Sequence, residues 1–426
     1  MSAVVFTNIR VLDGTGKAPF AGHVRVQGNR IQEVLPTDAP LPGAPDADII
    51  DGTGCTLMPG LTEAHAHPSF ANISSLHALG EIPPEEHTLI TARNAKLMLD
   101  QGFTSLNSAA SGKPRLDIVI RNAINAGEIP GPRILAASPE LTTTGGLGDP
   151  SLMHMHRDTF AVVLDGPDEF RKYARLMCRE GVDTIKINPS GDEFVPVARA
   201  EMTVMNEAEV AAVVEVATTR NKRVMAHARS AESVKMCLRH GIDLINHATF
   251  TDDEAVDMME AKKHRIFVMP AIGVIFTALY EAAEWGISTQ VAEGLGMRRE
   301  LDHACKRMAE YRQRGIRVLP GGDYGFAWNP IGRNARDLEH FVNLFGFSPM
   351  EAIVAATKYG GEVMMRGDEL GQVKPGYLAD LLMVDGDPLA DIRILQDANR
   401  LVGIMKDGAF HKRPIAHGRP HSLAAE

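Results

Sequence analysis

The sequence predicts an α/β fold: a (β/α)8 TIM barrel with a small β-sandwich domain formed by both chain ends. Eight short apolar runs alternate with segments of helical spacing, which is typical of βα units and a parallel sheet. Polar residues follow the ends of several runs, as they do at the top face of such a barrel. The 426 residues accommodate a barrel of about 250–310 residues and one smaller unit.

The barrel is expected over residues 57–365. Its predicted strands are residues 57–64, 104–107, 133–137, 183–188, 223–227, 242–247, 266–270 and 317–321. Helical spacing marks residues 88–101, 116–126, 168–180, 207–219, 230–239 and 301–314. Several of these helices begin with Ser, Thr or Asp, which helix starts prefer.

The smaller domain is expected from residues 1–56 together with 366–413. Both regions read as short strands separated by turns, of which Gly28 and Asn29 are a typical hairpin signal. The predicted strands are residues 4–9, 23–27, 30–35 and 48–50, then 370–373, 379–385, 401–406 and 409–411. Residues 414–426 show no periodicity and are expected to be a mobile tail.

Composition narrows the class of protein. The net charge of −10 and the absence of basic runs argue against a nucleic-acid partner. No apolar stretch approaches the roughly 18 residues of a membrane span, and the apolar run at the N-terminus is too short for a signal peptide. Four scattered cysteines, without disulfide or metal spacing, indicate reduced thiols. We therefore expect a cytoplasmic protein.

The first candidate site is a histidine pair. His65 and His67 end an apolar strand, and their i, i+2 spacing directs both side chains to one face. Two converging imidazoles suit a divalent metal ion, although the triplet by itself could be a structural pair.

Four further residues end later strands and would meet this pair at the top of the barrel: Lys186, His227, His247 and Asp323. Each also has a structural explanation. A strand-end lysine can form a salt bridge, the two histidines can be ordinary barrel residues, and Asp323 can cap the next helix. Their occurrence together with the histidine pair favours metal ligation.

With these residues in order, the chain resembles the metal-dependent amidohydrolase superfamily over nearly its whole length. The resemblance also includes residues 51–52 (DG), 58–67 (MPGLTEAHAH), 371–381 (GQVKPGYLADL) and 385–388 (DGDP). Within the superfamily it is similar to the branch of imidazolonepropionase-like proteins, prolidase-like dipeptidases and ochratoxin-type carboxypeptidases.

The resemblance implies a binuclear centre. His65, His67 and Asp323 would hold one divalent ion, His227 and His247 a second, and Lys186, carboxylated by CO₂, would bridge them. Carbamylation replaces an ammonium, which would repel two dications, by a carboxylate-like group. The two metals would lower the pKa of a bridging water towards about 7 and make hydroxide available. Asp323 and Lys186 are thus the expected catalytic residues, with Asp323 moving the proton.

Mixed imidazole and carboxylate ligation favours Zn²⁺ as the metal, with Mn²⁺ and Co²⁺ as alternatives.

Arg229 is the first candidate for substrate binding. It follows His227 by two residues, so it can reach past the strand end and pair with a substrate carboxylate. A salt bridge to a neighbouring loop explains it equally well. Tyr324 follows Asp323 directly and, with other aromatic residues nearby, suggests an apolar pocket wall. Core packing of these loops is the alternative.

His154 and His156 form a second His-X-His in a long loop, residues 139–158. No apolar strand delivers this pair to a fixed position, which argues against metal ligation. Related enzymes often place a histidine after a Gly-Gly segment such as 145–146, against the substrate carbonyl. Leu147 stands there in this chain, so the role would pass to His154 or His156. The alternative is a solvated loop.

The sequence therefore predicts hydrolysis of the amide bond of a small molecule, by a hydroxide that bridges two metals. The favoured substrates are N-acyl amino acids, dipeptides or ochratoxin-like amides. The alternatives are a carbamate, aryl-urea or anilide hydrolase, a cyclic-amide hydrolase, and an assembly protein that has no catalytic role. The resemblance also implies a homo-oligomer.

Overall fold

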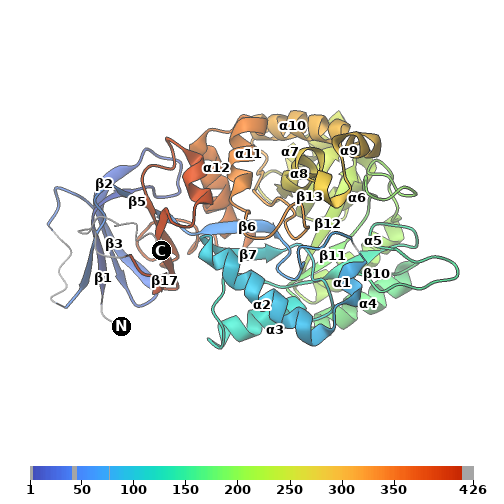
Figure 1. The fold of residues 1–426 in the computed structure, drawn as a ribbon, viewed down its shortest axis with the longest axis horizontal. Coiled ribbons are helices and arrows are strands. Elements are labelled where there is room, and N and C mark those ends of the chain that lie inside the picture. The colour runs from blue at the N-terminus through green and yellow to red at the C-terminus, as the bar shows by residue number, and fades with distance from the viewer. Residues whose placement is uncertain (1–2, 41–45, 76, 415–426) are drawn as a thin grey trace.

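The computed structural model describes residues 3–40, 46–75 and 77–414. Figure 1 shows an elongated molecule with a sheet at one end and helices around shorter strands at the other. The expected mobile tail, residues 414–426, lies outside the described residues except for Pro414. Within the described residues, no helix combines the length and the apolar character that a membrane crossing requires.

Both chain ends contribute to one eight-stranded sheet. Its hydrogen-bonded order is β17-β16-β15-β5-β1-β2-β3, and β4 pairs with β1. The strands are β1 (Val4–Val11), β2 (Phe20–Gln27), β3 (Arg30–Pro36), β4 (Asp48–Asp51), β5 (Cys55–Pro59), β15 (Leu381–Asp385), β16 (Leu401–Lys406) and β17 (Ala409–Lys412). The predicted β-sandwich is thus confirmed in part: the ends do join, but in a single hydrogen-bonded sheet. The domain boundaries stay a prediction.

The first predicted barrel strand, 57–64, is two strands. Residues to Pro59 belong to β5 in the terminal sheet, and β6 (Leu61–Ala66) starts the parallel region. The chain changes sheets at Gly60, whose backbone N–H donates to the Asp380 carbonyl at 2.9 Å. Gly60 packs so tightly against the Thr104 side chain that a Cβ atom would not fit. A glycine is therefore required where the chain passes between the two regions.

The remaining strands are parallel and form two sheets, ordered β6-β7-β8 and β10-β9-β11-β12-β13-β14. Their bounds are β7 (Phe103–Ser108), β8 (Arg133–Leu135), β9 (Ala137–Thr142), β10 (Ala161–Val163), β11 (Thr184–Ile187), β12 (Arg223–Ser230), β13 (Leu244–Phe250) and β14 (Phe267–Met269). Most predicted strands match these bounds within a few residues. The third predicted strand is longer than expected, because β9 continues it beyond residue 137.

Backbone hydrogen bonds connect these two sheets on both sides. The Ala136 carbonyl, between β8 and β9, accepts from the backbone N–H of Asp183 at 2.8 Å. On the other side, Ala64 of β6 donates to the Pro320 carbonyl at 3.1 Å, and Leu319 donates to Val268 of β14 at 2.9 Å. The predicted eighth strand, 317–321, forms only an isolated bridge to β14. It contains Pro320, and a proline lacks the N–H that a strand ladder needs. The barrel prediction is therefore confirmed only as parallel βα units.

Helices follow most of these strands and cover them (Figure 1). They are α1 (Ala78–Glu81), α2 (Pro84–Asp100), α3 (Leu116–Asn125), α4 (Pro167–Glu180), α5 (Glu207–Thr219), α6 (Ala231–Arg239), α7 (Asp253–Ala261), α8 (Ile272–Tyr280), α9 (Thr289–Leu295), α10 (Met297–Arg314), α11 (Arg336–Phe345), α12 (Pro349–Ala356) and α13 (Lys358–Val363), with short 3₁₀ turns η1 (Ala283–Trp285) and η2 (Ile392–Gln396). Side-chain caps begin several of them: Ser230 accepts from Ser233 N–H, and Asn206 forms a capping box with Glu209.

Candidate active site

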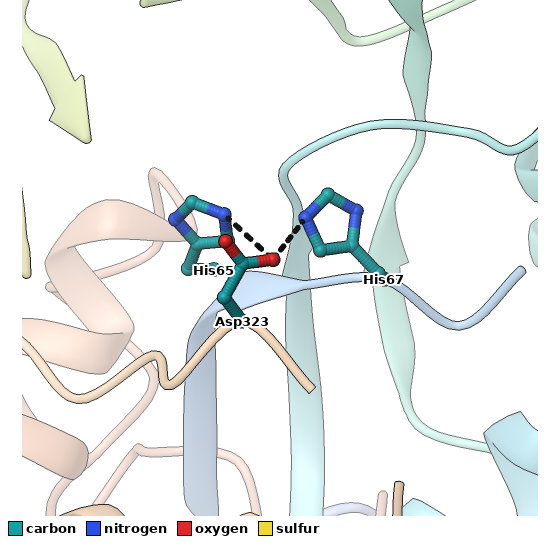
Figure 2. A group of neighbouring side chains, drawn as sticks. All are labelled: His65, His67 and Asp323. Atoms are coloured by element: carbon teal, nitrogen blue, oxygen red, sulfur yellow. Dashed lines mark ion pairs between the residues drawn. The ribbon is translucent and has the colours of Figure 1, made fainter. Parts of the chain in front are cut away.

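The histidine pair and Asp323 meet in one place. Figure 2 shows the Asp323 carboxylate lying between the imidazoles of His65, in β6, and of His67, directly after β6. Asp323 Oδ1 is 3.1 Å from His67 Nε2 and 3.7 Å from His65 Nε2. One ligand atom from each of the three residues lies within 4.8 Å of the others, a spacing that a single metal ion can bridge.

The backbone positions these three groups closely. The Nδ1–H of His67 donates to the Ala110 carbonyl at 3.2 Å, which leaves the Nε2 lone pair free for a metal. Gly321 lies directly against the backbone of His65, where a Cβ atom would come within 2.6 Å of the His65 nitrogen. Asp323 has φ 59°, in the left-handed region. Backbone strain of this kind at a non-glycine residue is often found at functional sites.

A second histidine pair faces the first. The ring centroids of His227 and His247 are 4.3 Å apart, and those of His65 and His247 are 5.4 Å apart. His227 Nε2–H donates to the Gly191 carbonyl at 3.0 Å, so its Nδ1 lone pair is free. His247 is 1% exposed, and neither of its ring nitrogens has a hydrogen-bond partner among the described residues. Buried polar atoms rarely lack partners, and a metal ion would supply one.

Lys186 is buried in the same part of the molecule as these histidines. Its side chain is 1% exposed, and its Nζ is 3.9 Å from Glu140 Oε1 on the adjacent strand. Burial lowers the pKa of Lys186. The negative charges of Glu140 and Asp323 raise this pKa, but by less. A lowered pKa favours the neutral amine, the form that reacts with CO₂.

The electrostatics suit metal ligation. Burial holds the pKa values of His65, His227 and His247 well below 6.5, so these imidazoles are neutral at pH 7. Burial alone would raise the pKa of Asp323, but the nearby His65 and other groups outweigh it and lower that pKa, so the carboxylate is ionised. Neutral imidazole and ionised carboxylate are the ligating forms, and the residues therefore fit a divalent metal centre.

These six residues line one cavity, and the space within it and at its open mouth is about 590 Å³. An aromatic wall stands beside them: Phe326 and Trp328 stack with centroids 5.3 Å apart, and Phe70 stacks on His67 at 4.0 Å. The other residues that line the cavity are Glu140, Leu147, Phe160, Asp192, Phe194, Arg229 and Val274. The cavity can therefore enclose a small molecule with an apolar part next to the candidate metal ligands.

The family model of the amidohydrolase family matches residues 56–410. The chain belongs to this family. It is therefore a hydrolase that acts on amide C–N bonds. This confirms the superfamily and the branches that the sequence resembles. An ochratoxinase of Aspergillus niger is 25% identical to this chain over 84% of its length and 76% of the length of that protein. An imidazolonepropionase of Rubrobacter xylanophilus is 22% identical over 91% of this chain and 90% of that protein.

Two solved structures are also similar. One is a prolidase complexed with N-methylphosphonate-L-proline, with a TM-score of 0.86 and 27% identity over 97% of this chain and 100% of the other. The second is a Xaa-Pro dipeptidase with bound methionine in the active site, with a TM-score of 0.85 and 26% identity over 96% of this chain and 100% of the other.

Arg229 of this amidohydrolase lines the cavity but is also held by carboxylates. Its Nε donates to Asp192 Oδ2 at 2.9 Å, and its Nη1 contacts Glu300 Oε1. Arg229 is 3% exposed and forms buried salt bridges, and it also faces the cavity. The salt-bridge interpretation and the substrate-binding interpretation of the sequence therefore each apply in part. Of its five N–H groups, those on Nη2 have no hydrogen-bond acceptor among the described residues, which leaves them for a ligand.

Three other predicted substrate residues are not brought to the cavity wall of this amidohydrolase. Tyr324 is 2% exposed, its hydroxyl donates to Asp337 Oδ1 at 3.2 Å, and it is not among the lining residues. His154 and His156 are both exposed, and His156 lies 3.5 Å from Asp158. Within the described chain, neither histidine lines the cavity. Their contact with substrate stays a prediction that this arrangement does not favour.

Sequence reasoning missed two acidic residues on this amidohydrolase's cavity wall. Glu140 lies towards the carboxyl end of β9, the same position in a βα unit as the predicted ligands. This position is the sequence signal by which Glu140 could have been predicted. Asp192 lies in the loop after β11, where no pattern marks it. Both are nearly fully buried, at 4% and 5% exposure.

Proposed function

We propose that this protein is a binuclear metal-dependent amidohydrolase that cleaves the amide bond of small N-acyl amino acids, dipeptides or ochratoxin-like substrates. One observation carries the proposal. Four histidines, a lysine and an ionised aspartate from five separate segments of the chain line a single cavity next to an aromatic wall. The proposal includes closure of the parallel strands, through residues 317–320, into a (β/α)8 barrel, which would bring strand ends together in this way.

His65, His67 and Asp323 would hold one metal ion, and His227 and His247 the other. Lys186, as its CO₂-derived carbamate, would supply the oxygens that both ions share. The bound ions would polarise the substrate carbonyl and make hydroxide available at neutral pH. Zn²⁺ is the metal that this mixture of imidazole and carboxylate favours.

Asp323 has the properties of the proton carrier. Its carboxylate is ionised, lies at the centre of the site, and can take a proton from the attacking water. The same group can then deliver this proton to the leaving nitrogen, which must be protonated to depart as an amine. The position of Asp323 is held by its left-handed backbone and by Asn329, whose side-chain N–H donates to its carbonyl at 3.0 Å.

The favoured substrates follow from the cavity and from the relatives. The Phe326 and Trp328 rings offer an apolar surface, and Arg229 offers free N–H groups to a carboxylate. Relatives of at least 25% identity include an ochratoxinase, a prolidase complexed with a proline derivative, and a dipeptidase with bound methionine. Proline and methionine both carry a carboxylate.

A second candidate is hydrolysis of carbamates, aryl-ureas or anilides. The observation that favours it is the balanced charge of Arg229, which already contacts Asp192 and Glu300. A guanidinium between two carboxylates attracts a further anion less than a free one does. Neutral substrates would then be preferred.

A substrate panel on the Zn²⁺-loaded protein in bicarbonate buffer separates these candidates. We expect cleavage of dipeptides or N-acyl amino acids, detected as free amino acid by chromatography. Asp323→Asn should lower kcat by roughly 100-fold or more, because it cannot carry the proton. Cleavage confined to carbamates, ureas or anilides would select the second candidate. No cleavage of any amide by protein that holds two metals per chain would refute the proposal.

A further inference from the structure

Glu140 lies beside Lys186 and has no role in the mechanism above. The two residues are partners in register on the neighbouring strands β9 and β11. Glu140 is 4% exposed and lines the cavity. Its Oε2 accepts from Asn188 Nδ2 at 2.6 Å, while its Oε1 faces Lys186 Nζ at 3.9 Å. Asn188 therefore fixes one oxygen and leaves the other directed toward the lysine.

Carbamylation of Lys186 would reverse the charge that Glu140 faces. The reaction joins the lysine nitrogen to the carbon of CO₂ and releases two protons from the ammonium to solvent. The side chain changes from a cation to an anion. Among the described residues, Asn188 is then the hydrogen-bond donor that remains to the Glu140 carboxylate. The metal ions of the proposed centre would offset the charge of the carbamate, but Glu140 would have lost the cation beside it, and a buried carboxylate without a paired cation is unfavourable.

We propose, on the basis of the function proposed above, that Glu140 binds the α-ammonium group of a dipeptide substrate. The substrate ammonium would replace the cationic partner that Glu140 loses when Lys186 is carbamylated. An ammonium donates up to three hydrogen bonds, and Glu140 Oε1 has lone pairs directed toward the cavity. Binding would form a charge-assisted pair in a poorly solvated site.

The position of Glu140 fits the chemistry of a dipeptide. The α-nitrogen is attached to the carbon next to the scissile carbonyl, so it must lie close to the groups that bind this carbonyl. Glu140 neighbours Lys186 at that place. The α-carboxylate lies on the other side of the scissile bond, and Arg229 lines the cavity as its partner. The cavity thus has a carboxylate for the α-ammonium end of a dipeptide and a guanidinium for its α-carboxylate end. N-acyl amino acids and carbamates lack the ammonium.

The first test compares L-alanyl-L-phenylalanine with propionyl-L-phenylalanine, which differs only by lacking the amino group. The wild type should prefer the dipeptide in kcat/KM by roughly 10-fold or more. Glu140→Gln keeps the shape and the acceptor for Asn188 but removes the charge. It should lose roughly 10- to 100-fold on the dipeptide and less than about 3-fold on the propionyl compound.

Glu215→Gln is the matched control, since it removes an exposed carboxylate that pairs with Arg171 on the surface. It should leave both substrates unaffected. An equal loss on both substrates in Glu140→Gln would overturn the inference while the proposed function stands. If the wild type, loaded with two metals per chain, cleaves neither compound nor any other amide, the proposed function itself fails.

The second test measures binding without turnover. Calorimetry should show that L-methionine binds the metal-loaded wild type at least 10-fold more tightly than 4-(methylthio)butanoate, which lacks the amino group. Glu140→Gln should abolish this difference. Its metal content should stay equal to that of the wild type. Loss of a metal in Glu140→Gln would show that Glu140 is a ligand of the centre instead, and would overturn the proposal.

Discussion

Replacement of Arg229 tests how the cavity wall is built. The Arg229 side chain is 3% exposed and connects Asp192 in the loop after β11 to Glu300 on α10, whose side chains are 8% and 1% exposed. In Arg229→Ala both carboxylates lose their cation while they stay buried. Breaking a buried ion pair by removal of one partner costs about 3–5 kcal/mol. We expect the free energy of unfolding of Arg229→Ala to fall by about this amount.

Arg229→Lys separates the structural role from substrate binding. A lysine keeps the positive charge but cannot reach two carboxylates and a ligand with one planar fork. Its free energy of unfolding should therefore fall by a smaller amount, about 1–3 kcal/mol. If Arg229 also binds the substrate carboxylate, kcat/KM of this variant should fall roughly 10- to 100-fold on L-alanyl-L-phenylalanine and much less on the corresponding carboxamide.

Urea unfolding of the metal-free proteins, with a constant m value, supplies the free energies, and product chromatography supplies kcat/KM. A loss below about 1 kcal/mol in Arg229→Ala would refute the reasoning, because it would mean that Asp192 and Glu300 do not depend on Arg229. Equal losses on the dipeptide and the carboxamide would contradict carboxylate binding by Arg229.

Two further predictions follow from the same structure. Gly321→Ala should displace His65 and lower metal affinity roughly 10-fold by competition with a chelator, whereas Gly294→Ala, whose Cβ meets no described atom within 4 Å, should not. Chelation should abolish amide hydrolysis, and Zn²⁺ with bicarbonate should restore it; activity that survives complete metal removal would argue against a metal centre.

The candidate ligands could be predicted because their placement depends on simple periodicities. His65 and His67 share a face through the two-residue period of a strand, and they follow an apolar run that the core requires. His227 and His247 lie in nearly the same register on neighbouring parallel strands, and this brings their ring centroids to 4.3 Å. Strand direction and burial were sufficient to predict these contacts, and neither depends on loop conformation.

Other features depend on local conformations that no periodicity reports. Tyr324 was expected on the pocket wall because it follows Asp323, but the left-handed backbone at Asp323 turns the chain, and Tyr324 packs inward against Asp337. Glu140 was missed because the proline at position 139 argues against a strand, yet β9 continues through it to Thr142. The split of the first strand at Gly60 depends on a contact with Thr104, which lies 44 positions away.

The carboxylate partners of Arg229 illustrate a different limit. Glu300 is separated from Arg229 by 71 positions and lies on α10, beyond the strands β13 and β14 and the helices α6 to α9. Helical spacing predicts a helix directly after Glu300, over residues 301–314, but not which loop that helix contacts. Side-chain pairs of this kind require the tertiary arrangement, and for this reason the sequence left the salt bridge and the substrate contact as equal alternatives.

Metal stoichiometry, with and without bicarbonate, tests the central claim most directly. The account predicts that purified protein, stripped of metal and reloaded with Zn²⁺, holds two ions per chain when bicarbonate is present and fewer when it is removed, because the Lys186 carbamate bridges the pair. One ion per chain under both conditions, or no retained metal, would contradict a binuclear centre that Lys186 completes.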